Sequence, residues 1–215
     1  MYNELLKEKD SILVSSLENL KNLKDYKTKK ETINNLLTEN AEARIFEIIS
    51  YAILKNHYKN VKIYIGYNKN SLQEEFLHLY KTGRTNANDG GIDFVMRPIG
   101  RYFQVTEVNN YDKYLLDIDK VMHFPITFVI KTKVCREKIY EMLREYINIR
   151  ANGMRIIEER YSKAIEEVIT INELQQWTLD LADNDIDNII HDIDLYYRLE
   201  MNLNEEDGQE VLSYL

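Results

Sequence analysis

The glycines and prolines of this chain are crowded into one window, and their placement constrains the fold more than any other feature. Five of the seven glycines and both prolines lie between positions 66 and 125. Helices tolerate Gly and Pro least, so long helices are predicted on both sides of this window, with strands and turns inside it. The pattern therefore predicts an α/β core between two helical flanks.

The N-terminal flank predicts two helices. Leucines and isoleucines recur at helical spacing through the first thirty residues, among many charges. A second helix is predicted to begin near Thr38 or Asn40, since either residue suits an N-cap, and to bury one apolar face. We expect the first helix to pack its apolar residues against the rest of the protein.

Four segments rich in β-branched and aromatic residues predict strands, at 61–67, 92–97, 102–108 and 125–132. The short link at 97–100 predicts a hairpin between the second and third strands. The segment 111–124 has helical spacing and predicts a crossover to a parallel fourth strand. From about residue 133 to 203 the pattern is helical again. We therefore expect an N-terminal helical segment (1–37), an αβββαβ core with a mixed central sheet (38–135), and a helical annex with an acidic tail (136–215).

Composition excludes several classes of protein. The 215 residues contain no apolar run long enough to span a bilayer, and their start lacks the layout of a signal peptide. The single cysteine, Cys135, cannot form an internal disulfide. We therefore expect a globular protein of the cytoplasm with no membrane partner.

The net charge of −8 comes from one end of the chain. Residues 180–210 carry eleven acids and one base, whereas the remainder carries 27 bases and 25 acids. The body is therefore slightly basic and compatible with a nucleic-acid partner. We expect the acidic tail to lie away from a phosphate path, as a surface for a protein partner, or else to act as a self-inhibitory mimic of DNA.

The segment 83–94 is the most informative for chemistry. Its paired glycines, Gly90 and Gly91, lead into Asp93 at the start of a strand. On the next strand Gln104 and Thr106 share one face. Hairpin strands can thus direct a carboxylate and an amide oxygen into one cleft, a donor set suited to Mg²⁺, and a helix carboxylate could add another oxygen.

These residues resemble the Mrr-like branch of the PD-(D/E)XK nucleases, which includes restriction enzymes. The resemblance rests on the stretch from Asp89 to Asp93 (D-G-G-I-D), on Gln104-Val105, and on Phe46-Glu47 in the preceding helix. It covers about residues 39–132, under half the chain. It implies the restriction-endonuclease-like fold and Mg²⁺-dependent hydrolysis of double-stranded DNA, with Mn²⁺ able to substitute, by a homodimer formed through the N-terminal helix or the annex.

The resemblance also implies roles for single residues. Asp93 would be the central metal ligand, with Gln104 in the second acidic position and Glu47 as the helix carboxylate; Glu42 is a rival for the last role. Thr106 stands where the family has a catalytic lysine, so another cation must replace it or catalysis is lost. The nearby cations are Lys81, Arg84, Arg101 and Lys120. Glu107 points to the opposite strand face and ranks below Gln104 as a ligand.

A set of cations flanks the predicted cleft and would bind phosphates: Lys81, Arg84, Arg97 and Arg101. The four histidines lack metal-ligand spacing, so no zinc site is predicted. Two alternatives remain open. The chain could be a catalytically silent member of the fold that binds nucleic acid or a protein, as Thr106 suggests, or a ribonuclease in phage defence or a toxin role.

Overall fold

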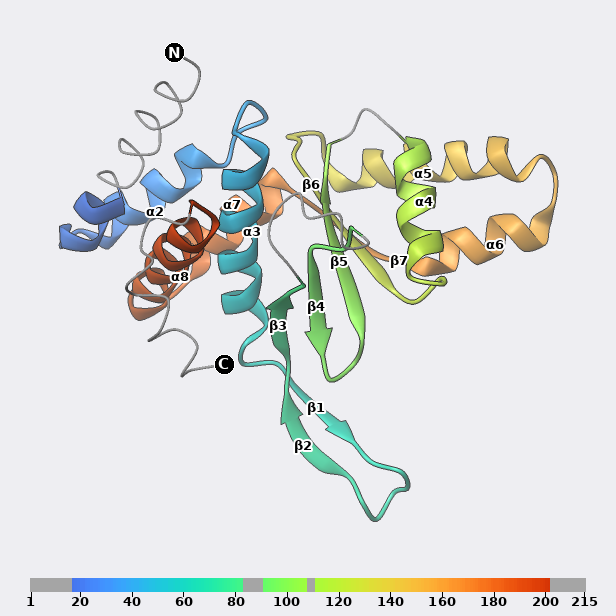
Figure 1. Cartoon of the computed structure of the whole chain (residues 1–215), viewed down its shortest axis with the longest axis horizontal. Helices are drawn as coiled ribbons and strands as arrows, with labels where there is room; N and C mark the ends of the chain where they lie inside the picture. Colours follow the sequence, from blue (N-terminus) through green and yellow to red (C-terminus); the bar gives the residue numbers. More distant parts are fainter. Residues whose placement is uncertain (1–16, 83–90, 108–110, 202–215) are drawn as a thin grey trace.

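The computed structural model describes residues 17–82, 91–107 and 111–201 of the chain. Five strands form a mixed sheet in the order β3-β4-β5-β6-β7, and two more form a separate antiparallel hairpin, β1-β2. Helices cover both faces of the larger sheet (Figure 1). The chain is therefore of mixed α/β class, and within the described residues no helix is long and apolar enough to cross a membrane.

The N-terminal flank is broken where the sequence predicted one continuous helix. Residues 17–22 are helical, and α2 (Tyr26–Leu36) begins after Asp25, whose carboxylate accepts a hydrogen bond from the Thr28 N–H at 3.1 Å. This N-cap starts a new helix. The next helix, α3 (Ala43–Tyr58), begins a few residues later than predicted, after Glu42. Residues 1–16 lie outside the described part.

The first core strand is not the one predicted. The segment at 61–67 contains β1 (Lys62–Ile65), but β1 pairs with β2 (Gln73–Phe76) and not with the main sheet. The sheet instead begins with β3 (His78–Lys81), which is antiparallel to β4 (Phe94–Arg97). The predicted position was wrong because β3 contains no β-branched residue, and Leu79 is its only fully buried residue.

The remaining core strands confirm the predicted connections. β4 pairs antiparallel with β5 (Arg101–Thr106) in a hairpin, with Phe94 opposite Phe103. A crossover through α4 (Tyr111–Lys120) leads to β6 (Ile126–Ile130), which is parallel to β5. From α3 onward, apart from the β1-β2 hairpin, the order of elements is therefore α, three strands, α and a strand.

The annex is not wholly helical, because it adds a fifth strand to the sheet. After α5 (Arg136–Ala151) and α6 (Arg155–Ala164), β7 (Ile165–Thr170) pairs in parallel with β6. Its apolar residues alternate poorly and fit helical spacing equally well, so the sequence pattern was ambiguous. α7 (Ile171–Asp180) and α8 (Asp183–Met201) then return to α3.

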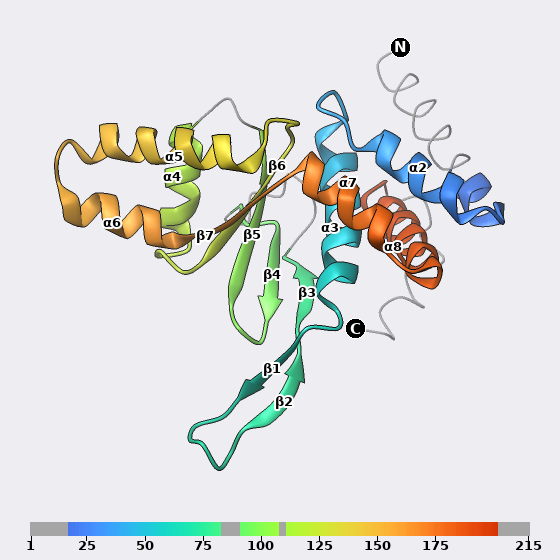
Figure 2. The same cartoon turned by 180° about the vertical axis from the view of Figure 1, so that it is seen from behind.

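Two apolar layers enclose the sheet. One face, with Phe94, Phe103 and Val129, packs on α3, α7 and α8. The other face, with Phe128 and Val168, packs on α4, α5 and α6. Figure 2 shows these two helical groups on opposite sides of the strands. The first and last quarters of the chain thus meet on one face of the sheet.

Candidate functional site

Asp93 lies immediately before β4 and ties it to β5. Its backbone N–H donates to the Phe103 carbonyl at 3.2 Å, and its carboxylate oxygen Oδ2 accepts from the Val105 N–H at 2.6 Å. A side chain thus takes the place of a backbone acceptor at this point of the ladder. The carboxyl group is held in a fixed position by the hairpin that carries it.

The surroundings of Asp93 disfavour its charged form. Burial, followed by the negative charge of Glu47, raises the pKa of Asp93 from 3.8 to about 7. The Val105 N–H and the positive charges of Lys113 and Lys81 oppose this rise. A buried carboxylate beside another carboxylate is stabilised by any cation that binds between them.

Glu47 reaches this region from α3 and is paired with a lysine. Its Oε1 lies 3.0 Å from Lys81 Nζ, and both side chains are 8% exposed. Lys81 also lies 3.2 Å from Glu200 Oε1, in the last turn of α8. Glu42, the rival candidate, is exposed at the N-cap of α3. Of the two glutamates, the structure therefore brings Glu47 to Asp93.

Gln104 lies across the hairpin from Asp93, because extending the β4-β5 register by one residue pairs the two positions. Its neighbours Phe103 and Val105 pack in the layer of α3, so its side chain belongs to the layer of α4. Gln104 is buried, and its amide oxygen Oε1 has no hydrogen-bond partner among the described residues. An unpaired buried acceptor is costly, and a bound cation would satisfy it.

Thr106 is engaged away from Asp93. The phenol of Tyr114 on α4 lies near Thr106 and donates a hydrogen bond to the Glu107 carbonyl at 3.2 Å. Thr106 is buried. Its contacts join β5 to α4 and supply no positive charge.

The cations expected around one cleft are dispersed. Lys81 lies beside Glu47, and Arg84 falls outside the described residues. Arg97 is exposed at the far end of β4, over the ring of Tyr80. Arg101 is engaged by Glu167 Oε2 at 2.5 Å and by the Thr127 hydroxyl at 2.7 Å. The grouping inferred from sequence proximity is therefore wrong for Arg97 and Arg101, because the two ends of a strand are separated by its length.

Two lysines of α4 also lie near the site: Lys113, which the sequence analysis did not name, and Lys120, which it named as a possible replacement for the missing lysine. Lys113 acts electrostatically on Asp93 from α4. Lys120 is bound to the buried Asp117 at 2.9 Å, and a methyl group on Gly91 would lie 2.9 Å from its Nζ. The helical spacing of α4 predicts which of its apolar residues face the core. It does not predict where its lysines lie.

The acidic end of the chain is closer to the core than expected. Within α8, acids pair with lysines of the N-terminal half: Asp185 with Lys59, Asp187 with Lys29, Asp192 with Lys55, Asp194 with Lys21, and Glu200 with Lys81. The acids of α8 are therefore engaged within the chain, and the expectation that the acidic segment lies away from a phosphate path stays a prediction. Residues 202–215 lie outside the described part.

The donor types at Asp93 fit a hard divalent cation. Carboxylate and amide oxygens are the ligands that Mg²⁺ prefers, and Asp93, Glu47 and Gln104 carry such oxygens. The structure places Glu47 on the α3 side of the sheet and Gln104 on its α4 side, with Asp93 on the hairpin strand between them. Within the ranges that the structure describes, however, no cluster of three or more His, Cys, Asp or Glu side chains is placed to hold a metal. Asp89, in the neighbouring loop, is outside those ranges.

Comparisons with known proteins do not supply a family. No family model matches the chain, and neither a curated protein nor a solved structure is detectably similar to it.

Proposed function

We propose that this protein is a Mg²⁺-dependent endonuclease that hydrolyses phosphodiester bonds in double-stranded DNA, of the restriction type, with Asp93 at its centre. The observation that carries the proposal is the half-buried Asp93 carboxyl, which the Val105 N–H holds at 2.6 Å and whose charge is disfavoured by its surroundings and by Glu47. The order of α3, β3 to β5, α4 and β6 supports it, because this is the αβββαβ order of the PD-(D/E)XK nucleases.

In this proposal Asp93 is the central ligand of the cation, with Glu47 as the candidate second ligand from the side of α3 and Gln104 as the candidate from the side of α4. A bound Mg²⁺ would supply a Lewis acid for the scissile phosphate and a water of lowered pKa. Asp93 is held by the Val105 N–H and must lose its proton near neutral pH before it can bind a cation. Lys81 pairs with Glu47 at 3.0 Å and balances part of the negative charge of the group.

The test is cleavage of plasmid DNA by the purified chain with Mg²⁺ or Mn²⁺, with structured RNA offered in parallel. We expect cutting of DNA by the wild type and none by Asp93→Ala. Asp180→Ala, at the exposed end of α7, is the control and should cut normally. Equal cutting by wild type and Asp93→Ala rejects the site, and cutting of RNA alone identifies a ribonuclease.

A second candidate is a catalytically silent protein of this fold that binds nucleic acid. It is favoured by Thr106, a buried and uncharged residue at the position where the nuclease family has a lysine. This candidate predicts DNA binding without cutting under any metal, and activity gained by Thr106→Lys. If the wild-type protein cuts DNA, this second candidate function is excluded.

A further inference from the structure

The β1-β2 hairpin projects from the end of the main sheet, away from both helical groups (Figures 1 and 2). Seven of the eight residues in its two strands are exposed. Large apolar and aromatic side chains are prominent among the exposed residues of this arm: Tyr64, Ile65, Tyr67, Leu72 and Phe76. An isolated two-stranded hairpin is only marginally stable in water, and clustered exposed apolar side chains mark interaction surfaces.

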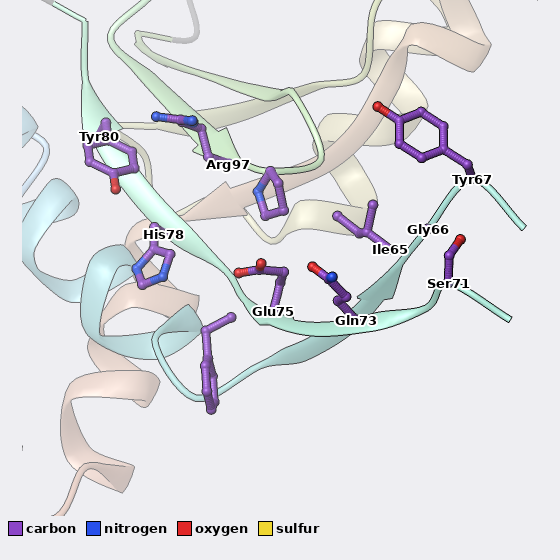
Figure 3. A pocket seen from close by; sticks show the side chains of 11 residues that line it. Ile65, Gly66, Tyr67, Ser71, Gln73, Glu75, His78, Tyr80 and Arg97 are labelled. Atoms are coloured by element: carbon purple, nitrogen blue, oxygen red, sulfur yellow. The ribbon is translucent and has the colours of Figure 1, made fainter. Parts of the chain in front are cut away.

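A groove of about 640 Å³ lies between this hairpin and the far end of β4. Its hairpin wall includes Ile65 and Glu75, and the opposite wall includes Tyr80, Arg97 and Pro98. Figure 3 shows Ile65 and Glu75 on the side of the hairpin that faces Arg97. The groove thus combines apolar surface with charge.

The charges of the hairpin are only partly satisfied within the chain. Lys62 and Glu74 pair with each other at 2.7 Å. Glu75 in the groove and Lys69 in the loop between the strands have no ion pair among the described residues, and both are exposed. The hairpin therefore presents one unpaired acid in its groove and one unpaired base near its tip.

This arrangement is complementary to itself. We propose that a second copy of this chain docks here, with the hairpin tip of each copy on the groove of the other, so that Lys69 meets the partner's Glu75 twice about a two-fold axis. Such reciprocal contact is the property of an isologous dimer. Two chains of net charge −8 repel each other at long range, and the opposite charges of this hairpin offset part of that repulsion locally.

The test is the mass of the full chain in solution, by light scattering after gel filtration and by sedimentation velocity, without DNA or metal. We expect a dimer for the wild type and for Lys27→Glu, a matched reversal of an exposed lysine on α2. Lys69→Glu and Glu75→Lys should each raise the dimer dissociation constant at least about tenfold. Both sites are exposed, so circular dichroism and the melting temperature of each monomer should match those of the wild type held below its dissociation constant.

Charge exchange makes the test specific. In a mixture of Lys69→Glu with Glu75→Lys, both contacts become complementary again, and the double variant restores them in every copy. We expect a dimer in both cases. A monomeric wild type at high concentration, or a dimer indifferent to either reversal, overturns the proposal. So does a loss of DNA affinity in Lys69→Glu without any change in mass, because that assigns the arm to nucleic acid.

Discussion

Lys81 Nζ lies 3.0 Å from Glu47 Oε1 in a place where both side chains are 8% exposed. The same ammonium group meets Glu200 at 3.2 Å, so one lysine joins α3, β3 and α8 at the candidate site. Because the pair is buried, neither charge has water to replace a lost partner. Lys81 therefore stabilises the fold, a role beyond that of the surface lysine that was expected to bind phosphates.

Removing this lysine should be costly. We expect Lys81→Met to lower the free energy of unfolding by about 3–5 kcal/mol, because it removes a buried ammonium group that both Glu47 and Glu200 contact. Urea denaturation at neutral pH measures the loss. The double variant Lys81→Met/Glu47→Gln should recover part of it, since one of the two buried negative charges is then gone. Equal stability of the two variants would show that Glu47 does not depend on Lys81.

The raised pKa of Asp93 makes stability depend on pH. With a pKa of about 7 when folded and 3.8 ordinarily, the folded state binds more protons than the unfolded state between about pH 4 and 7. The stability contributed by protonated Asp93 is therefore full at low pH and lost as pH rises through 7. Asn cannot ionise and can still accept from Val105, so Asp93→Asn should stabilise the chain by about 2 kcal/mol more at pH 8 than at pH 5. Asp180→Asn is the control, and a gain independent of pH contradicts the assignment.

Binding of Mg²⁺ to this site can be detected without any cleavage assay. A cation that binds only the folded state raises the melting temperature, and the rise requires the ionised ligand. At pH 8 we expect millimolar Mg²⁺ to raise the melting temperature of the wild type and to leave that of Asp93→Asn unchanged. An identical shift in both proteins places the bound ion elsewhere.

The same substitution should lower the stability of the chain at Arg101 and leave it nearly unchanged at Arg97. Arg101 is bound to Glu167 and Thr127, and its guanidinium lies 4.9 Å from the ring centre of Phe103. We expect Arg101→Gln to cost about 1.5–3 kcal/mol of stability and to leave the salt dependence of DNA binding unchanged. Arg97→Gln should be nearly neutral for stability, because Arg97 is exposed. Similar losses of stability in both variants would refute this division.

Two glycines offer a matched comparison at the candidate site. Gly91 and Gly100 have positive φ angles of 74° and 69°, and only Gly91 has a side chain, that of Lys120, in the space of an added methyl group. Gly100→Ala should cost about 1–2 kcal/mol from backbone strain alone. Gly91→Ala should cost more, because Lys120 must move from Asp117. In a Lys120→Met background the two glycine substitutions should cost the same; thermal denaturation provides the comparison.

The local sequence pattern was sufficient to predict those elements whose packing partners are near in the sequence. The link at 97–100 joins two strands that pair directly, and α4 is followed at once by its parallel strand β6. In both cases periodicity and turn chemistry determine the neighbour. The same reasoning brought Asp93 and Gln104 to facing positions, since both belong to that hairpin.

The local sequence pattern could not predict the elements whose packing partners are distant in the sequence. β7 is a strand because β6 offers it an edge, although its sequence fits a helix equally well. β1 has the composition of a core strand, yet β3 occupies that place because Leu79 and Lys81 contact α3 and α8. The pairing of Glu200 with Lys81 joins positions 119 residues apart, and no spacing rule predicts such a contact.

The late position of β7 has a consequence for how the chain is made. β6 is buried along its whole length, and β7, which lies beside it, is followed by the helices that cover α3. The ribosome makes α3 and β6 before these segments, so the apolar surfaces of α3 and β6 emerge before the elements that cover them. The sheet can be completed only after β7 has emerged, and until then β6 presents an open strand edge.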